Sequence, residues 1–277
     1  MLELGIYHDL EVLRSTSVGL FLGNGDEEVL LPNKYVPEIF KIGDIIRVFV
    51  YLDSLERVVS TTLIPLITLN TCAFLEVAHL TDDGAFLEIG LEKQLMVPFR
   101  EMISKMRVRQ SYVVYCYLDK LTNRLIASTK VNKFLSNQEL TVQRFEEVDL
   151  LVSHISDIGV NVIVNNKHRG LIYHDDLYVP LSIGDRCKGI VKLIRPENKL
   201  DISLQDLAYK NIEPNANLIL EHIRMNDNFL NLNDNSPPEE IHRILKMSKK
   251  NFKKAVGSLY KNKLIEIKEN GIQLISK

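Results

Sequence analysis

The chain has 277 residues, of which 45% are hydrophobic and 25% charged, and its formal net charge is −2. These are ordinary globular values, and they exclude a histone-like protein. The N-terminus has neither the basic start nor the apolar core of a signal peptide, and the most apolar stretch, Leu63–Leu80, is interrupted by Pro65, Asn70 and Glu76. We therefore expect no membrane partner.

The near-neutral total conceals a gradient of charge along the chain. Residues 1–62 carry 5 basic and 10 acidic side chains, whereas residues 207–277 carry 12 and 8. A polyanion would be met mainly by the C-terminal half. Any binding of nucleic acid must come from local basic patches, because the net charge does not favour it.

Three glycines mark an internal repeat. Gly19, Gly84 and Gly159 each follow a Leu-x-Val segment at the same interval, and each precedes a short apolar run. The copies recur at an interval that is too long for a solenoid unit and typical of a small autonomous domain. The sequence therefore predicts an array of modules.

Each copy contains a row of short strands. Runs rich in β-branched and apolar residues alternate with turn material such as Gly43-Asp44. Five strands in so short a span predict a small closed barrel, because an open sheet would leave both edges unpaired. We predict a mainly β protein whose barrels occupy residues 1–63, 64–133 and 145–207, with a short helical or irregular linker at residues 131–148.

The last part of the chain changes to helical spacing. Leu218–Met225 predicts one helix, and Ser236 with Glu239 forms a capping-box pattern at the start of a second. Ser248 is expected to cap a third helix with an apolar stripe on one face. Asn270-Gly271 lies between two alternating runs and predicts a hairpin. Three helices and a terminal hairpin predict a winged helix-turn-helix at residues 215–277.

These features together resemble one family, the CvfB (conserved virulence factor B) or YitL-like proteins. The resemblance covers almost the full chain and is carried by Val29–Pro32, Gly43–Asp53, Arg124–Lys130, Gly170–Tyr173, Lys199–Leu204, Ser236–Ile241 and Met247–Lys261. It implies three tandem S1-type OB-fold barrels followed by a winged helix-turn-helix domain. It also implies a cytoplasmic RNA-binding regulator of bacterial gene expression, with no enzymatic step.

Barrels of this type bind single strands by stacking bases on aromatic rings beside a positive groove. The resemblance places the stacking aromatic at the second residue after the repeated glycine, which is Phe21, Phe86 and Asn161. Copies one and two keep the aromatic residue, and copy three has lost it. The alternative, that Phe21 and Phe86 pack inward or against a neighbouring module, stays open without the strand register.

Copy three offers charge in place of the missing ring. Lys167, His168 and Arg169 follow a turn at Asn165-Asn166. Tyr173 takes the place where many such modules have histidine on the binding face. Three further cations, Arg186, Lys188 and Lys192, share one parity along a strand. We interpret this set as phosphate contacts beside a stacking tyrosine, and the alternative is an ordinary solvated face.

The last helix carries lysines on the face opposite its apolar stripe. They include Lys249, Lys250, Lys253 and Lys254. Such a face could contact phosphates in a groove, as recognition helices do. It lacks the Arg, Asn or Gln that would read base edges, and plain solvation explains the lysines equally well.

The sequence offers little for catalysis, metals or cofactors. Cys72, Cys116 and Cys187 lie far apart in apolar runs, which is typical of buried thiols in a reduced cytoplasmic protein. The seven histidines form no metal-ligand pattern, and no phosphate-binding glycine motif occurs. We therefore predict no enzyme activity, no cofactor, no metal and no small-molecule substrate.

The leading hypothesis is a multivalent protein that binds single-stranded RNA, with most of the affinity in residues 145–277. Weak modules in tandem gain affinity because the second contact is intramolecular. One alternative is a DNA-binding transcription factor that uses the winged helix. Another is an interaction scaffold whose barrels contact a ribosome or nuclease without touching RNA.

Overall fold

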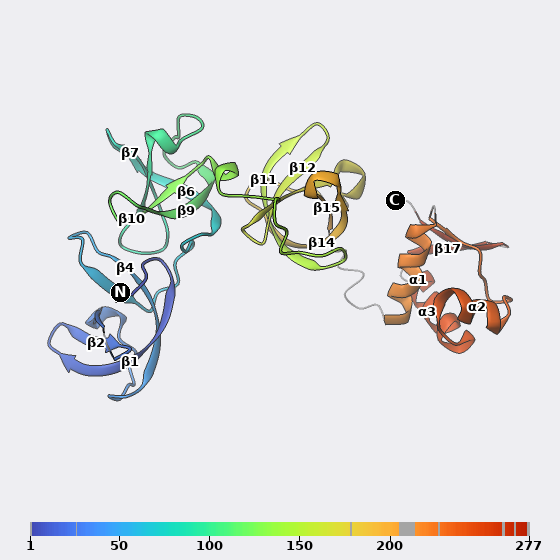
Figure 1. The fold of residues 1–277 in the computed structure, drawn as a ribbon, viewed down its shortest axis with the longest axis horizontal. Coiled ribbons are helices and arrows are strands. Elements are labelled where there is room, and N and C mark those ends of the chain that lie inside the picture. Colours follow the sequence, from blue (N-terminus) through green and yellow to red (C-terminus); the bar gives the residue numbers. More distant parts are fainter. Residues whose placement is uncertain are drawn as a thin grey trace. The chain divides into compact units, whose positions relative to one another are not determined.

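A computed structural model describes residues 2–25, 27–177, 179–204, 214–226, 228–261, 264–268 and 270–275 (Figure 1). The chain divides into two compact units, Met1–Leu204 and Gln205–Lys277. Asp26, which opens the acidic run Asp26-Glu27-Glu28 of copy one, and residues 205–207 of the predicted third barrel lie outside the described residues. No helix among the described residues is long and apolar enough to span a membrane.

The first unit consists of three closed five-stranded barrels with one topology. Their strands are β1 (Tyr7–Thr16), β2 (Gly19–Gly23), β3 (Glu28–Pro32), β4 (Ile45–Leu52) and β5 (Val58–Thr61) in barrel 1; β6 (Cys72–Leu80), β7 (Gly84–Leu87), β8 (Leu95–Pro98), β9 (Ser111–Asp119) and β10 (Arg124–Ser128) in barrel 2; and β11 (Glu147–Ser156), β12 (Gly159–Val164), β13 (His168–Tyr173), β14 (Arg186–Arg195) and β15 (Lys199–Leu204) in barrel 3. In each barrel the third and fifth strands pair in parallel, and the other neighbours pair antiparallel. The predicted class, mainly β with OB-type barrels, is confirmed.

The repeated glycines are required by the close approach of two strands. A Cβ at Gly19, Gly84 or Gly159 would lie 2.1, 2.2 and 2.1 Å from a carbonyl oxygen of the facing strand. No real Cβ tolerates such a distance from backbone, so a larger residue would push the second and third strands apart. The repeat seen in the sequence is therefore a requirement of barrel geometry.

The barrels pack on one another through buried side chains. Phe49 and Tyr51 of barrel 1 belong to the same apolar cluster as the core of barrel 2. Another cluster joins Cys72 and Tyr115 of barrel 2 to Ile163 of barrel 3. The three barrels therefore form a single packed unit, which the repeats alone did not predict.

The linker between barrels 2 and 3 lies against both of them. A short 3-10 turn, η3 (Val131–Lys133), follows β10, and the segment then runs without regular structure to β11. Lys133 forms an ion pair of 3.1 Å with the carboxylate of Glu101, which also accepts a hydrogen bond of 2.6 Å from Ser128. These contacts fix the start of the linker to barrel 2.

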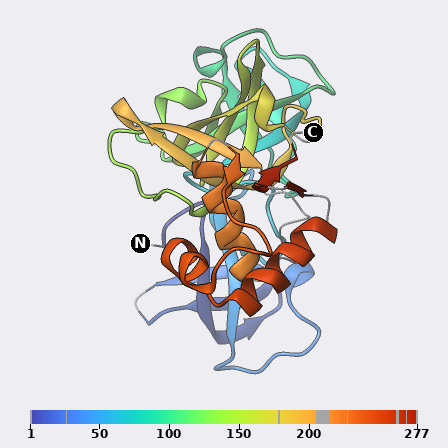
Figure 2. The ribbon, with the colours of Figure 1, turned by 90° about the vertical axis from the view of Figure 1, so that its right-hand side faces the viewer.

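The second unit is a winged helix-turn-helix. Its elements are α1 (Pro214–Met225), β16 (Phe229–Leu230), α2 (Pro238–Leu245), α3 (Lys249–Lys261), β17 (Ile265–Lys268) and β18 (Gly271–Leu274), drawn in orange and red in Figures 1 and 2. The strand order is β16-β18-β17. The predicted hairpin forms, because Lys268 pairs with Gly271 across the turn.

One predicted helix cap is right and one is wrong. The Ser248 hydroxyl accepts a hydrogen bond of 3.3 Å from the backbone N–H of Asn251, as expected at the start of α3. The capping box at Ser236 does not form, since α2 starts at Pro238 with no side-chain cap. The Ser236 hydroxyl instead accepts from the backbone N–H of Asn233. The Ser236 hydroxyl therefore stabilises a turn ahead of the two prolines and does not cap α2.

Candidate nucleic-acid interface

The strand alternation decides which way the predicted stacking position faces. Phe21, Phe86 and Asn161 are each partly exposed, and each is flanked on its own strand by two buried residues that belong to the barrel core. Because successive side chains of a strand point to opposite faces, these three point away from the core. Packing into their own barrel core is therefore wrong for Phe21 and Phe86. Phe86 lines a pocket together with Phe49 and Tyr51 of barrel 1, so the alternative of contact with a neighbouring module still stands for this residue.

A cation covers the ring in barrel 1. The guanidinium carbon of Arg14 lies 3.7 Å from the centroid of the Phe21 ring. Glu28 on the next strand forms an ion pair with Arg14, so the guanidinium plane is held over the ring. Arginine stacks on an aromatic face through cation–π attraction and can present its other face to a base.

An imidazole takes the same place in barrel 2. The His79 and Phe86 rings stack with centroids 4.8 Å apart and planes at 6°. In barrel 3 the corresponding pair is His154 and Asn161, which face each other across the two strands. The first two barrels therefore share an aromatic ring capped by a nitrogen-bearing planar group, and barrel 3 lacks the ring.

A bulge in the first strand of each barrel creates these pairs. The register shifts between Val12 and Arg14 in barrel 1, and it shifts at the equivalent place in the other two. One extra residue turns the next side chain onto the outer face opposite the stacking position. Sequence reasoning missed these partners, although the fixed spacing before each repeated glycine held the signal.

Barrel 3 moves its aromatic ring to the end of the next strand. Tyr173 pairs with Gly159, at the position that Pro32 and Pro98 occupy in the other barrels. The guanidinium of Arg195 lies 5.9 Å from the Tyr173 ring centroid. Nε of Arg195 donates a hydrogen bond of 2.9 Å to the carboxylate of Asp201, which is only 8% exposed. This bond holds the guanidinium in place. Like Arg14 and His79, Arg195 is a candidate site residue that sequence reasoning missed.

Three consecutive cationic candidates of barrel 3 have different environments. Lys167 and Arg169 are exposed at the turn and on β13. His168 is only 2% exposed, with Nδ1 2.7 Å from the Ser136 carbonyl oxygen and Nε2 2.8 Å from the Thr141 hydroxyl. Its ring pins the linker to barrel 3 and is not available to RNA in this structure.

The cations of β14 are already engaged with protein groups. Arg186 donates a hydrogen bond of 2.6 Å to the Cys72 carbonyl of barrel 2, so it joins two barrels. Lys188 lies 2.7 Å from an Asp149 oxygen, and the hydrogen bond to Asp149 raises the pKa of the lysine. Lys192 is paired with Asp176 at 2.7 Å. The predicted parity is correct, but these charges are partly neutralised.

The lysines of α3 lie outside its buried stripe. Phe252, Ala255, Val256 and Leu259 are the buried residues of the helix. Lys249 donates to the Ser236 carbonyl at 2.9 Å, and Lys253 lies 3.8 Å from Asp234. Lys250 and Lys254 are exposed. The helix therefore presents positive charge on the side away from the core of its unit.

Within the described residues, no three His, Cys, Asp or Glu side chains gather in a way that could hold a metal. Cys72 and Cys116 are buried, and burial raises the pKa of each thiol to about 12. Such thiols remain protonated and unreactive at neutral pH.

Comparison with known proteins agrees with this architecture. Residues 4–63 match the S1 domain, and residues 217–274 match the CvfB-like winged helix domain. YitL of Bacillus subtilis is 29% identical over 278 residues, covering 95% of this chain and 90% of the relative. Conserved virulence factor B of Staphylococcus epidermidis is 23% identical over 270 residues, covering 94% and 91%.

A solved structure from Streptococcus pneumoniae, described as a multidomain protein with nucleic acid binding domains, is also similar. It is 21% identical to this chain with a TM-score of 0.42, and the match covers 99% of each of the two chains. The fold and the two domain matches define a protein built from S1 and winged helix domains, which are types of domain that bind nucleic acid. The resemblance to the CvfB and YitL-like proteins that was predicted from the sequence is confirmed by these matches.

Proposed function

We propose that the protein binds single-stranded RNA along the outer faces of its barrels and acts as a post-transcriptional regulator of bacterial gene expression. The observation that carries the proposal is the recurrence of an outward aromatic ring with a planar cationic or imidazole partner. Phe21 with Arg14, Phe86 with His79, and Tyr173 with Arg195 are the three pairs.

Each pair suits a base of a single strand. Bases stack on aromatic side chains whatever their identity, and a guanidinium adds a cation–π contribution and a donor for phosphate. In a duplex the base faces are already stacked on their neighbours, so these rings would have nothing to bind. The geometry therefore favours a single strand over double-stranded nucleic acid.

The winged helix supports a second, weaker contact. Its exposed lysines add positive charge, so the contact would depend on salt. Sequence reasoning overlooked Asn251, which is exposed on the same helix and is a residue type that reads base edges. Because the two units belong to one chain, binding of one raises the effective concentration of the other near the strand.

The alternative of a DNA-binding transcription factor rests on the α2–α3 pair. Helix α3 follows α2 after a turn in which Lys246 has a left-handed backbone (φ 52°), an arrangement that places a second helix for groove binding. A filter-binding series with single-stranded RNA, single-stranded DNA and duplex DNA at two salt concentrations separates the two functions. We expect the tightest binding for single-stranded RNA. Equal or tighter binding of duplex DNA would favour the alternative.

A further inference from the structure

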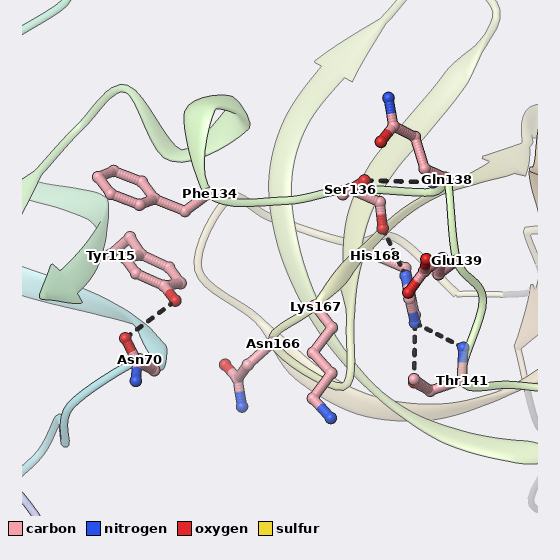
Figure 3. Close-up of a pocket in the computed structure, with 10 residues that line it drawn as sticks. All are labelled: Asn70, Tyr115, Phe134, Ser136, Gln138, Glu139, Thr141, Asn166, Lys167 and His168. Atoms are coloured by element: carbon pink, nitrogen blue, oxygen red, sulfur yellow. Dashed lines mark hydrogen bonds between the residues drawn. The ribbon is translucent and has the colours of Figure 1, made fainter.

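A cavity of about 500 Å³ lies between barrels 2 and 3, under the linker that joins them (Figure 3). Barrel 2 contributes Tyr115, and Asn70 lies just before its first strand. The β12–β13 turn of barrel 3 contributes Asn166 and Lys167, and the linker contributes Phe134 and Glu139. The cavity thus draws its wall from barrel 2, barrel 3 and the linker between them.

The linker wall is fixed to barrel 3 by hydrogen bonds. The Asn137 side chain accepts from the backbone N–H of Arg169 and donates to the Arg169 carbonyl, each at 2.8 Å, as a neighbouring strand would. His168 binds the Ser136 carbonyl and the Thr141 hydroxyl from the buried side. The cavity is therefore formed before any ligand arrives.

The barrel 2 wall is fixed as well. The Tyr115 and Phe134 rings stack with centroids 4.3 Å apart and planes at 4°. The Tyr115 hydroxyl lies 3.4 Å from the side-chain oxygen of Asn70, and the backbone N–H of Cys72 donates to the side-chain oxygen of Asn166 at 2.9 Å. Both amides use their oxygen, which leaves their NH₂ groups as donors.

Several polar groups of this fixed cavity have no protein partner. Among the described residues, no hydrogen bond or ion pair engages the ammonium of Lys167, the carboxylate of Glu139 or the amide nitrogens of Asn70 and Asn166. Figure 3 shows Asn166 and Lys167 extending side by side from their turn, on the side of the cavity where Asn70 lies. Asn70, Glu139 and Lys167 are exposed, so they can exchange water for a ligand, and polar groups that converge at a pocket are typical of a ligand site.

The chemistry of these groups fits one nucleotide. Amide NH₂ groups donate to the ring nitrogens and carbonyl oxygens of a base, and a carboxylate accepts from its amino or imino groups. The Tyr115 ring is covered by Phe134 and only 8% exposed, so it borders the base with its edge and hydroxyl, and a lysine ammonium neutralises a phosphate. We propose that this cavity binds one unstacked nucleotide, with its base at Asn70 and Asn166 and its phosphate at Lys167.

The nucleotide that we expect is one residue of the RNA strand as it passes from barrel 2 to barrel 3, so the inference rests on the proposed function. A free nucleotide carries the same chemistry. The two sources are separated by measuring both, with the full chain, an unmodified single-stranded RNA of mixed sequence, and the free nucleoside monophosphates.

The test is ultraviolet cross-linking of the RNA to the full chain, with the linked peptides identified by mass spectrometry. We expect a cross-linked nucleotide on Tyr115 or on residues 134–141, besides those at the outer rings of the barrels. Asn70→Gly should abolish the cavity cross-link and preserve the fold, because Asn70 has a positive φ of 61° that glycine adopts without strain.

Affinity measurements use a matched pair of lysine variants. Lys167→Ala should weaken RNA binding and lower the slope of log affinity against log salt by roughly 0.7, the value for one phosphate contact to a single strand. Lys105→Ala removes an exposed lysine of barrel 2 that does not line the cavity, and it should change neither.

Each outcome decides the inference separately from the proposed function. If the wild-type chain binds RNA and cross-links only at the outer rings, or if Lys167→Ala behaves like Lys105→Ala, the cavity is not a nucleotide site. If no RNA binds, the proposed function fails, and binding of the free nucleoside monophosphates then decides whether the cavity is a nucleotide site. Binding of a free nucleotide that Asn70→Gly abolishes would then support the site, and absence of such binding would overturn it.

Discussion

At the scale of single residues, the protein groups that pair with a cationic side chain decide whether it can bind a phosphate of nucleic acid. Arg169 and Lys188 are both exposed on barrel 3, but Lys188 lies 2.7 Å from Asp149, whereas Arg169 has no ion pair to another described residue. A phosphate would have to compete with Asp149 for the lysine. The two side chains therefore differ in what they can contribute, although the sequence gives them equal standing.

This difference predicts distinct salt dependences for two variants. Arg169→Ala should flatten the slope of log affinity for single-stranded RNA against log salt by roughly 0.7, because one phosphate contact is lost. Lys188→Ala should leave the slope almost unchanged. Filter binding over a salt series measures both. Equal slopes for the two variants would show that the ion pair does not decide the contact.

The buried carboxylate of Glu101 predicts a pH dependence of stability. Burial alone would raise its pKa, but the hydrogen bond from Ser128 and the ion pair with Lys133 lower it overall. The stabilisation is therefore fully present above the unfolded pKa of about 4.3, and it is lost as pH falls through the lower folded pKa.

We expect Glu101→Gln to lower the free energy of unfolding of the barrel unit by roughly 1–3 kcal/mol near neutral pH. The difference in unfolding free energy from wild type should shrink below about pH 4, because the wild-type carboxylate then becomes protonated and loses its charge. Urea unfolding at several pH values measures it, with the exposed Glu38→Gln as control. A difference independent of pH would contradict the role of the charge.

At the scale of elements, glycines in different surroundings predict opposite effects of one substitution. Gly159→Ala places a Cβ 2.1 Å from the Ile172 carbonyl and should destabilise barrel 3 by roughly 1–3 kcal/mol. Gly257 lies within α3 with no atom within 4 Å of its would-be Cβ, so Gly257→Ala should stabilise that helix by roughly 0.5–1 kcal/mol. Hydrogen exchange of each unit distinguishes the two. A stable Gly159→Ala barrel would refute the account of the repeat.

The junction between barrels 2 and 3 predicts a structural role for Arg186. Its guanidinium donates to the Cys72 carbonyl, and Cys72 itself is fully buried. Arg186→Ala should therefore speed the labelling of the Cys72 thiol in the native protein, while Cys116 in the core of barrel 2 stays protected. Lys188→Ala, which removes a charge from the same strand, serves as control. Unchanged labelling would leave Arg186 as a candidate for RNA contact.

At the scale of the whole molecule, periodic features were predictable and contacts between modules were not. The glycine repeat and the helical spacing predicted three barrels and a winged helix because each follows from local periodicity. The burial of His168 was partly predictable, since it shares strand parity with buried Gly170 and Ile172. Its role in holding the linker, and the joint cluster of Tyr115 with Ile163, depend on docking that no local pattern encodes.

The packing between barrels also changes how the predicted dominance of residues 145–277 should be tested. Cutting the chain between barrels 2 and 3 would expose Leu151 and Ile163, which are buried in the shared cluster. A fragment made in this way would lose affinity for reasons unrelated to RNA contact. Substitutions in the full chain are the cleaner approach, because they leave the junctions intact.

The most direct test of the central claim removes the three outward rings together. A full-length variant with Phe21→Ala, Phe86→Ala and Tyr173→Ala should bind single-stranded RNA more weakly, by roughly 1–3 kcal/mol for each base stack lost, with an unchanged salt slope. Circular dichroism establishes that the variant is folded. Wild-type affinity in the folded variant would contradict the claim that these barrel faces bind RNA.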